Sequence, residues 1–358
     1  MKIDLPSDPV MRMTLLDRIG IKLGRRIDSH LLGRMWGQWI DRPVSTEQAM
    51  LYIDQLRALV KKLQEGVARP KGSPDYAQIY TKLLNELEPL VNARDFDERG
   101  VALAHALAQL EVGRTASAML FLHFFEGLNR HVLDELRGLL SSRVVLHMSC
   151  IARLQRAEES VLSFSAAEPT VSQLTIVGGA RGWRYEWDGT HRVLTVPASD
   201  AYEGLPQKIA AALRILAHLP QVKAVLKVDD DLRLGTLGAL DSVFRVAEQT
   251  GKGQLGHVIR TKFEGDHSRA WHFEKCSDTV LNGRAFHHFT GSRWCDGALG
   301  YLVSQKGLRA VAWAALYFDG EIQSALYEDV MMSNIMQRLG GGLGQLGMGG
   351  ATATIATF

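Results

Sequence analysis

The chain has 358 residues, about the length of two ordinary domains. Hydrophobic residues make up 46% and charged residues 22%, a globular composition that excludes a mainly disordered, collagen-like or coiled-coil protein. Lys and Arg total 41 and Asp and Glu total 39, so the net charge is only +2 and predicts no nucleic-acid partner.

The cellular setting follows from three further observations. The cysteines are too few and too scattered for a disulfide framework or a closed zinc site, namely Cys150, Cys276 and Cys295. The N-terminus carries early acids and lacks the apolar core of a signal peptide. No apolar run is long enough to predict a membrane span. We expect a cytoplasmic protein with free thiols.

Residues 10–40 combine basic side chains with apolar ones, including Trp36 and Trp39. Such a segment can form a basic amphipathic helix, which lies on an anionic membrane surface or packs on its own domain. The first alternative predicts peripheral contact with the inner face of the membrane.

Helical periodicity runs through the first 140 residues. Ser45 and Gln48 have the spacing of a capping box. Apolar residues then recur every three or four positions, and further helices fit 97–112 and 115–140. Strand-like alternation is absent, so residues 1–140 are predicted to form an all-helical domain.

Strands alternate with helices from Arg143 onward. Short β-branched runs such as "RVVLHMSC" and "QLTIVGG" are each followed by a helical pattern or by glycines. This order predicts an α/β domain over 141–340, built on a mostly parallel sheet covered on both faces. Residues 341–358 form a Gly-rich C-terminal segment that is either a tail or a closing strand.

Three adjacent acids follow the apolar strand at 223–228: Asp229, Asp230 and Asp231. Ligands bind at this carboxyl edge in open α/β sheets. Adjacent carboxylates repel one another, which is tolerable when they are exposed or when a cation lies among them. Asp229 and Asp231 project to the same side of an extended chain and would hold one divalent ion between them. The alternative is a solvated acidic turn.

Two later segments carry related signals. In "LYEDVMMSNIMQRLG", Glu328 and Asp329 fall in the first turn of a helix, where they either cap it or supply a general base beside the site. In "WCDGALGYLVS", Gly297 and Gly300 allow the backbone to approach a ligand closely before a buried strand.

Together these segments resemble the β-1,3-galactosyltransferase and Fringe-like glycosyltransferases, which have a strand ending in Lys-x-Asp-Asp-Asp, then "GYLVS", then "EDV" heading a helix. The stretch at 197–216 is similar to the family's Asp-x-Tyr-x-Asn-Leu-x-x-Lys-Thr segment, with matches at Asp200, Tyr202, Leu205 and Lys208. "SCIARLQRAEESVLSF" is similar to the family's first strand and the Arg-rich helix after it. The resemblance covers about residues 143–340.

The resemblance implies a GT-A fold and inverting transfer from a nucleotide-diphosphate sugar, usually a UDP-sugar, to a glycan or glycolipid hydroxyl. Asp229 and Asp231 would form the DxD-type site for Mn²⁺ or Mg²⁺. Asp329 would be the base that deprotonates the acceptor hydroxyl. Further donor-side residues would be Lys208, Arg153, Arg156, Asp230 and Gly300. Glu328 would lie on the acceptor side.

Aromatic residues gather between the acidic strand and the "GYLVS" segment, among His267, His272, His287 and His288. Aromatic faces stack on sugars, so Trp271 and Trp294 are acceptor-side candidates. The alternative is an ordinary aromatic core with surface histidines.

The chain departs from the family pattern in two places. The family supplies a His metal ligand after the "EDV" helix, whereas the last histidine here is His288. Two residues also separate Gly297 from Gly300, where the family has Gly-x-Gly. Two other functions therefore stay open: a metal-dependent phosphohydrolase, and a catalytically degenerate scaffold or binding protein.

Overall fold

The computed structural model describes residues 44–65, 76–110, 114–235, 238–261, 268–287, 292–346 and 355–357. The expected amphipathic segment at 10–40 lies outside this part of the chain. Residues 43–358 form one compact unit, so the predicted division at residue 140 stays a prediction. Among the described residues, no helix has both the length and the apolar character needed to cross a bilayer.

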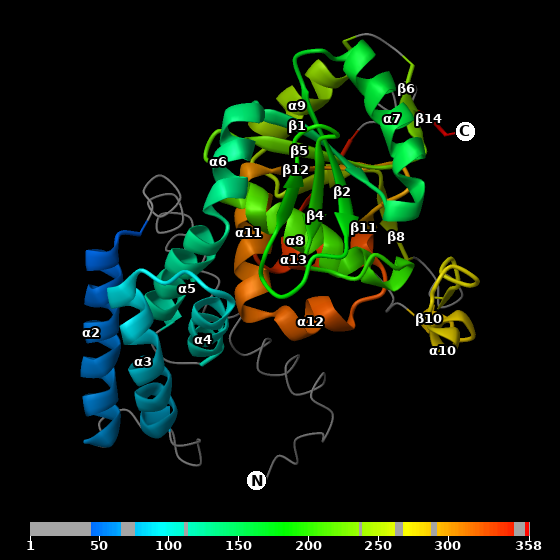
Figure 1. The fold of residues 1–358 in the computed structure, drawn as a ribbon. Coiled ribbons are helices and arrows are strands. Elements are labelled where there is room, and N and C mark those ends of the chain that lie inside the picture. The colour runs from blue at the N-terminus through cyan, green and yellow to red at the C-terminus, as the bar shows by residue number, and fades with distance from the viewer. Residues whose placement is uncertain are drawn as a thin grey trace. The chain divides into compact units, whose positions relative to one another are not determined.

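The described part begins with five helices: α2 (Thr46–Gln64), α3 (Tyr76–Ala93), α4 (Glu98–Ala108), α5 (Arg114–Leu128) and α6 (Arg130–Leu139). The capping box is present, since the Ser45 hydroxyl accepts from the Gln48 backbone and the Gln48 side chain accepts from the Ser45 backbone. Helices α2, α3, α4 and α5 pack side by side, in blue to cyan in Figure 1.

The prediction of one helix over 115–140 was wrong, because the chain breaks at Asn129. The Asn129 amide donates to the carbonyl oxygens of Phe125 and Trp183 and accepts from the backbone of Tyr185. A polar side chain that bonds to backbone groups competes with the helical ladder. Here it also ties the helices to the segment that precedes the third strand.

An eight-stranded sheet follows, in the order β13-β7-β12-β5-β1-β2-β4-β3. Its strands are β1 (Arg143–Met148), β2 (Ser172–Gly178), β3 (Glu186–Asp188), β4 (Val193–Val196), β5 (Ala224–Asp229), β7 (Gln254–Gly256), β12 (Tyr301–Ser304) and β13 (Leu343–Gln345). β1 pairs in parallel with β2 and β5, β2 with β4, and β7 with β13. β12 is antiparallel to both neighbours, and β3 is antiparallel to β4. The predicted mixed α/β class with a mostly parallel sheet is confirmed.

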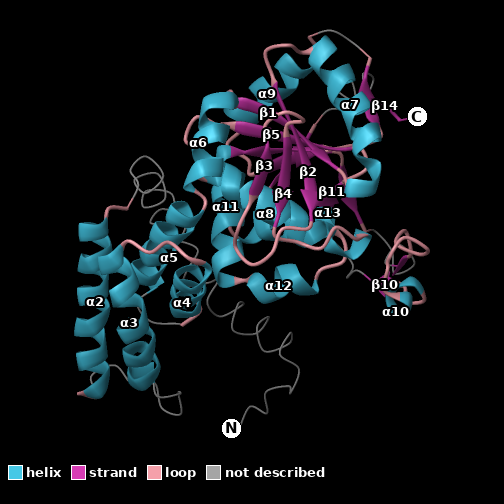
Figure 2. Ribbon diagram, viewed as in Figure 1, coloured by secondary structure: helices cyan, strands magenta, loops and turns pink. Residues whose placement is uncertain are grey.

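Helices cover both faces of this sheet (Figure 2). They are α7 (Leu154–Ala167), α8 (Leu205–Ala217), α9 (Ala239–Gln249), α11 (Gln305–Tyr317), α12 (Asp319–Ser324) and α13 (Glu328–Arg338), with short 3₁₀ turns η1 (Ile151–Arg153) and η2 (Tyr202–Gly204). α7 and α9 bury Phe164 and Phe244 against Leu226 and Val228 of β5. Because parallel crossovers are right-handed, α8, which links β4 back to β5, lies on the opposite face, where it packs with α11 and α13.

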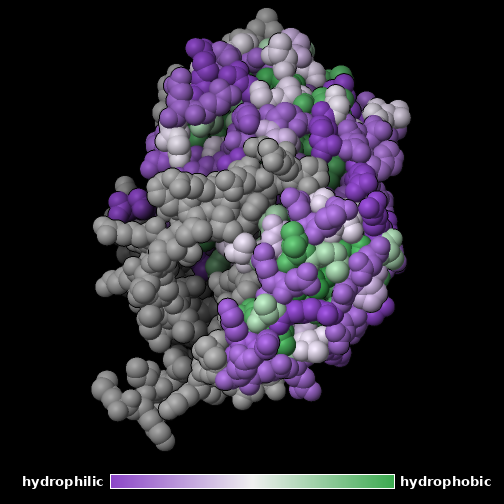
Figure 3. All heavy atoms as spheres, turned by 90° about the vertical axis from the view of Figure 1, so that its left-hand side faces the viewer, coloured by the Kyte–Doolittle hydropathy of each residue, from purple (hydrophilic) through white to green (hydrophobic). Residues whose placement is uncertain are grey.

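Small elements complete the described part: β6 (Leu232–Leu234), β8 (Val258–Arg260), β9 (Ser268–Arg269), β10 (Phe286–His287), β11 (Arg293–Cys295), β14 (Ile355–Thr357) and helix α10 (Thr279–Asn282). β8 pairs with β11 and β9 with β10. In the C-terminal segment, β13 joins the main sheet beside β7 and β14 pairs with β6, so both pieces act as closing strands. In the view of Figure 3, the described surface is mostly hydrophilic and is interrupted by small hydrophobic areas.

Candidate functional site

The three predicted acids stand where β5 ends. Asp229 is the last residue of the strand, and Asp230 and Asp231 turn into β6. Their side chains diverge toward different neighbours. Asp229 accepts from the Lys227 ammonium group at 2.7 Å, Asp230 accepts from the Ser149 hydroxyl at 2.9 Å, and Asp231 pairs with Arg156 at 2.7 Å. Burial raises the pKa of Asp230, and the Ser149 and Arg156 side chains oppose that rise.

The start of α13 meets this strand end through Lys227. The Lys227 side chain is 2% exposed, and its Nζ lies 2.7 Å from Asp229 Oδ1 and 2.7 Å from Glu328 Oε1. The other Glu328 oxygen accepts from the Tyr301 hydroxyl at 2.5 Å. The two acidic motifs, a hundred residues apart in sequence, are therefore joined by one buried cation.

Asp329 follows Glu328 in the first turn of α13 and is 7% exposed. Its Oδ1 accepts from the Val330 backbone at 2.8 Å, and its Oδ2 accepts from the Gly297 backbone at 3.4 Å. The N-terminal end of a helix stabilises such an anion. A Cβ atom on Gly297 would lie 2.7 Å from Glu328 Oε1, so a glycine is needed for this close approach.

Tyr202, in η2, lies near both acidic motifs. Burial raises its pKa to about 12, and the charges of Tyr327, Asp329 and Asp229 add to that rise. Gly297 also connects the two motifs directly, since its backbone N–H donates to Asp329 and its carbonyl accepts from Lys227, the partner of Asp229. The structure thus brings together the strand end and the helix start that the sequence predicted to share a site.

An open, polar groove of about 640 Å³ lies beside Asp231. Its lining includes three arginines and two acids: Arg153, Arg156, Arg233, Glu159 and Asp231. Arg233 pairs with Glu159 at 2.8 Å and Arg156 pairs with Asp231 at 2.7 Å, and the charge of Arg153 also acts on Asp230. A guanidinium fork suits a diphosphate, so this groove fits the predicted donor side.

Lys208 does not line that groove. It is 1% exposed, and its ammonium group donates to Asp200 Oδ1 and to the Ser149 carbonyl, both at 2.8 Å. Asp200 in turn accepts from the backbones of Ile151 and Gly178 at 2.7 Å. The expected donor contact is corrected here, because a buried and fully engaged ammonium group has no surface to offer a diphosphate. It joins the loops after β1 and β4 instead.

Two acceptor-side expectations are also corrected. Trp294, on β11, is 4% exposed and belongs to the core, and Glu328 is 8% exposed and engaged by Lys227 and Tyr301. Trp271 is 53% exposed. His272 is buried and bonds to the Tyr327 hydroxyl at 2.6 Å, so it is a core histidine.

Gly300 stands where the backbone must turn tightly before β12. Its φ is +77°, and a Cβ atom there would lie 2.7 Å from the Lys227 carbonyl oxygen. Only glycine accepts both conditions without strain. Gly300 therefore lets the loop before β12 pack directly against the backbone of β5, and it has a structural role there.

From the sequence, no role was assigned to Lys227, Tyr301 or Ser149. A signal for the first was available: Lys227 interrupts an apolar strand two residues before Asp229, and side chains at that spacing point to the same side. Tyr301, on β12, and Ser149, after β1, come next to these acids through the order of strands in the sheet. That order cannot be read from a single sequence.

The acids present suit a hard divalent cation. The side chains of Asp229 and Asp231 are 41% and 38% exposed, and each has one oxygen engaged by a basic group. Carboxylate oxygens are the donors that Mn²⁺ and Mg²⁺ prefer. No three His, Cys, Asp or Glu side chains within the described ranges converge on one point. A cation here would take the rest of its shell from water or phosphate oxygens.

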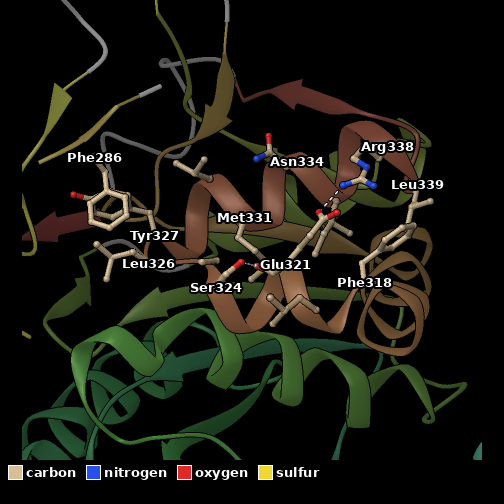
Figure 4. Close-up of a pocket in the computed structure, with 14 residues that line it drawn as sticks. Phe286, Phe318, Glu321, Ser324, Leu326, Tyr327, Met331, Asn334, Arg338 and Leu339 are labelled. Carbon is tan, nitrogen blue, oxygen red and sulfur yellow. Dashed lines mark hydrogen bonds and ion pairs between the residues drawn. The ribbon is translucent and has the colours of Figure 1, made fainter. Parts of the chain in front are cut away.

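A separate pocket of about 240 Å³ lies between α12 and α13 (Figure 4). Its walls are mainly apolar, including Ile322, Leu326, Met331 and Ile335, and its ion pair between Arg338 and Glu321 is closed on itself at 2.5 Å. This mainly apolar pocket presents one arginine, whereas the groove beside Asp231 presents three, so the groove is the better candidate for binding a diphosphate.

Comparisons with known proteins add little. No protein-family model matches the chain, and no curated protein matches it. Among solved structures, the galactosyltransferase LgtC in complex with donor and acceptor sugar analogues aligns with a TM-score of 0.29 at 11% identity, over 57% of this chain and 73% of that chain. An active-site mutant of LgtC aligns over the same shares with a TM-score of 0.30 at 11% identity. Similarities with TM-scores this low do not establish a shared fold, so the geometry above must carry the functional argument.

Proposed function

We propose that this protein is an inverting glycosyltransferase of GT-A type, which moves a sugar from a nucleotide-diphosphate donor, most simply a UDP-sugar, to a hydroxyl of a glycan or glycolipid. The observation that carries the proposal is the convergence at Lys227. The acid-bearing end of β5 and the acid-bearing start of α13 meet there, beside a groove lined by arginines.

In the proposed site, Arg153 and Arg156 bind the donor diphosphate in the groove. Asp229 and Asp231 would hold Mn²⁺ or Mg²⁺, which when bound neutralises charge on the departing diphosphate. Asp230, buried against Ser149, keeps the turn after β5 in place.

Asp329 would accept the proton of the acceptor hydroxyl as that oxygen attacks the anomeric carbon from the face opposite the diphosphate. Inversion needs one base on that side, and the N-terminal end of α13 favours a negatively charged side chain at this position. Trp271, which is 53% exposed, would contact the acceptor sugar.

Nucleotide binding is the first test. A thermal-shift panel of UDP, GDP and TDP, each with and without Mn²⁺, should show stabilisation by one nucleotide, because a ligand at about 100 times its Kd adds roughly 2.7 kcal/mol. A flat response to every nucleotide would favour the scaffold alternative. Metal-dependent phosphate release from p-nitrophenyl phosphate would favour the phosphohydrolase alternative.

Asp329→Asn is the second test. With the nucleotide found in the panel and an acceptor from a glycan screen, this variant should transfer sugar about 10²–10⁴-fold more slowly and bind the nucleotide as tightly as wild type. Asp319→Asn is a matched control, since Asp319 lies in the first turn of α12. Wild-type transfer rates in Asp329→Asn would remove this residue from the mechanism.

A further inference from the structure

Lys227 has a role beyond neutralising its neighbours. We propose that it is a positioning residue, which fixes the first turn of α13 against the end of β5 and so sets where Asp329 stands relative to the donor side. The consequence for catalysis rests on the function proposed above, whereas the positioning itself does not.

The ammonium group of Lys227 has three acceptors from three segments. It lies 2.7 Å from Asp229 Oδ1 on its own strand, 2.7 Å from Glu328 Oε1 on α13, and donates to the Gly297 carbonyl at 3.2 Å. An ammonium group has three donors, so this set uses all of them. With 2% of the side chain exposed, water does not compete for them.

Tyr301 completes the connection from the neighbouring strand. It is directly opposite Lys227 in the antiparallel β12–β5 pair, and the Lys227 Nζ lies 5.7 Å from its ring centroid. Burial first, and then the Glu328 charge, raise the pKa of the Tyr301 hydroxyl well above its ordinary value. The hydroxyl therefore stays protonated and donates a hydrogen bond to Glu328 Oε2 at 2.5 Å.

Both oxygens of Glu328 are thus fixed from the sheet side. Consecutive residues in an α-helix point about 100° apart, so fixing Glu328 inward also fixes the direction of Asp329. Gly297 donates to Asp329 Oδ2 and its carbonyl accepts from Lys227, so one residue of the glycine loop bonds to both the positioning lysine and the proposed base.

Stability alone is a poor explanation for this arrangement. A buried ion pair often contributes nothing, or less than a well-packed apolar group of the same volume, because both ions lose their hydration. What a fully bonded buried pair does provide is a defined geometry. A helix bearing a general base needs that, because a displacement of about 1 Å can reduce a rate about 100-fold.

The first measurement is independent of any activity. Hydrogen exchange followed by mass spectrometry should show faster exchange in the amides of 327–331 in Lys227→Met and in Tyr301→Phe, with unchanged exchange in β1 and β2. Lys223→Met is the control, because Lys223 is exposed at the other end of the same strand. Unchanged exchange at 327–331 in Lys227→Met would overturn the assignment.

The second measurement separates positioning from stability. It uses the double variant Lys227→Met/Glu328→Gln, which removes the lysine charge and the charge of its buried partner Glu328, and leaves Asp229, whose side chain is 41% exposed, in contact with water. We expect it to unfold closer to the wild-type temperature than Lys227→Met does, and to bind UDP without added metal as wild type does, because Arg153 and Arg156 in the groove are unchanged. Its kcat for sugar transfer should stay about 100-fold reduced. Recovery of kcat along with stability would show a structural role only, and would overturn the positioning assignment.

The two hypotheses fail separately. If wild type binds no nucleotide, the proposed function falls, and the exchange data still decide whether Lys227 positions α13. If wild type binds UDP and transfers sugar while the exchange data show no effect of Lys227→Met, the proposed function stands and the positioning assignment falls.

Discussion

Lys208→Met should destabilise the fold without touching the donor site, which is the opposite of what the sequence pattern predicts for it. The substitution removes an ammonium group that is 1% exposed and donates to Asp200 and Ser149 at 2.8 Å each. Removing one partner of a buried pair costs about 3–5 kcal/mol. The Asp200 side chain is 22% exposed and keeps two backbone donors, so the cost should lie near the lower end, about 3 kcal/mol.

Urea unfolding followed by circular dichroism measures this cost, and isothermal titration with UDP at a temperature where the variant is folded measures the donor site. The expected result is a lower unfolding free energy with an unchanged UDP affinity. Lys223→Met is the control for loss of an exposed lysine. A variant of wild-type stability that bound UDP about tenfold more weakly would refute the reasoning, because Lys208 would then contact the donor.

Three further results are expected. Arg156→Gln should weaken UDP binding about tenfold or more, since a hydrogen bond to a charged group contributes about 1.5–3 kcal/mol; equal affinity would exclude Arg156 from the donor groove. Gly297→Ala should lower the unfolding free energy by about 1–3 kcal/mol in chemical denaturation, because its Cβ would lie 2.7 Å from a carboxylate oxygen, whereas Gly320→Ala, with nothing within 4 Å, should be nearly neutral. Burial lowers the pKa of His147 from 6.5 to about 4, so its share of stability is complete above pH 6.5 and is lost as the pH falls toward 4. This contribution to the free energy of unfolding is at most about 3 kcal/mol. Between pH 6.5 and 4, the free energy of unfolding of His147→Gln should therefore fall less steeply than that of wild type.

Much of the sheet could be predicted from short-range pattern. β5 ends at Asp229, as the apolar run followed by acids indicated, and α13 begins at Glu328, where acids precede a helical period. These signals are local, because the apolar pattern of a buried strand and the residues of a helix's first turn both lie in a few consecutive positions. The same locality explains the error at Asn129, whose effect on the chain depends on partners more than 50 residues away.

The side-chain environment of the site could be predicted less well. Residue type gave Lys208 a cationic role at a ligand and Trp294 a sugar-stacking role, but both are buried. Whether a lysine or a tryptophan faces solvent depends on which elements cover it, and this is decided by sheet order and crossover geometry. Exposure separates Arg153 and Arg156 from Lys208, although all three carry the same charge.

Each of the three adjacent acids at the end of β5 has a basic or hydroxyl partner within the protein, which its sequence does not suggest. Three adjacent carboxylates imply strong mutual repulsion, and hence a cation among them, only if no basic side chain comes from elsewhere in the chain. Here Asp229 turns to Lys227, Asp231 to Arg156, and Asp230 to the Ser149 hydroxyl, so much of the repulsion is balanced by the protein. Repulsion is therefore no argument for a metal ion. The case rests instead on the half-exposed oxygens of Asp229 and Asp231 beside a groove fit for phosphate, and Mn²⁺ affinity should accordingly rise when the diphosphate is present to complete its shell.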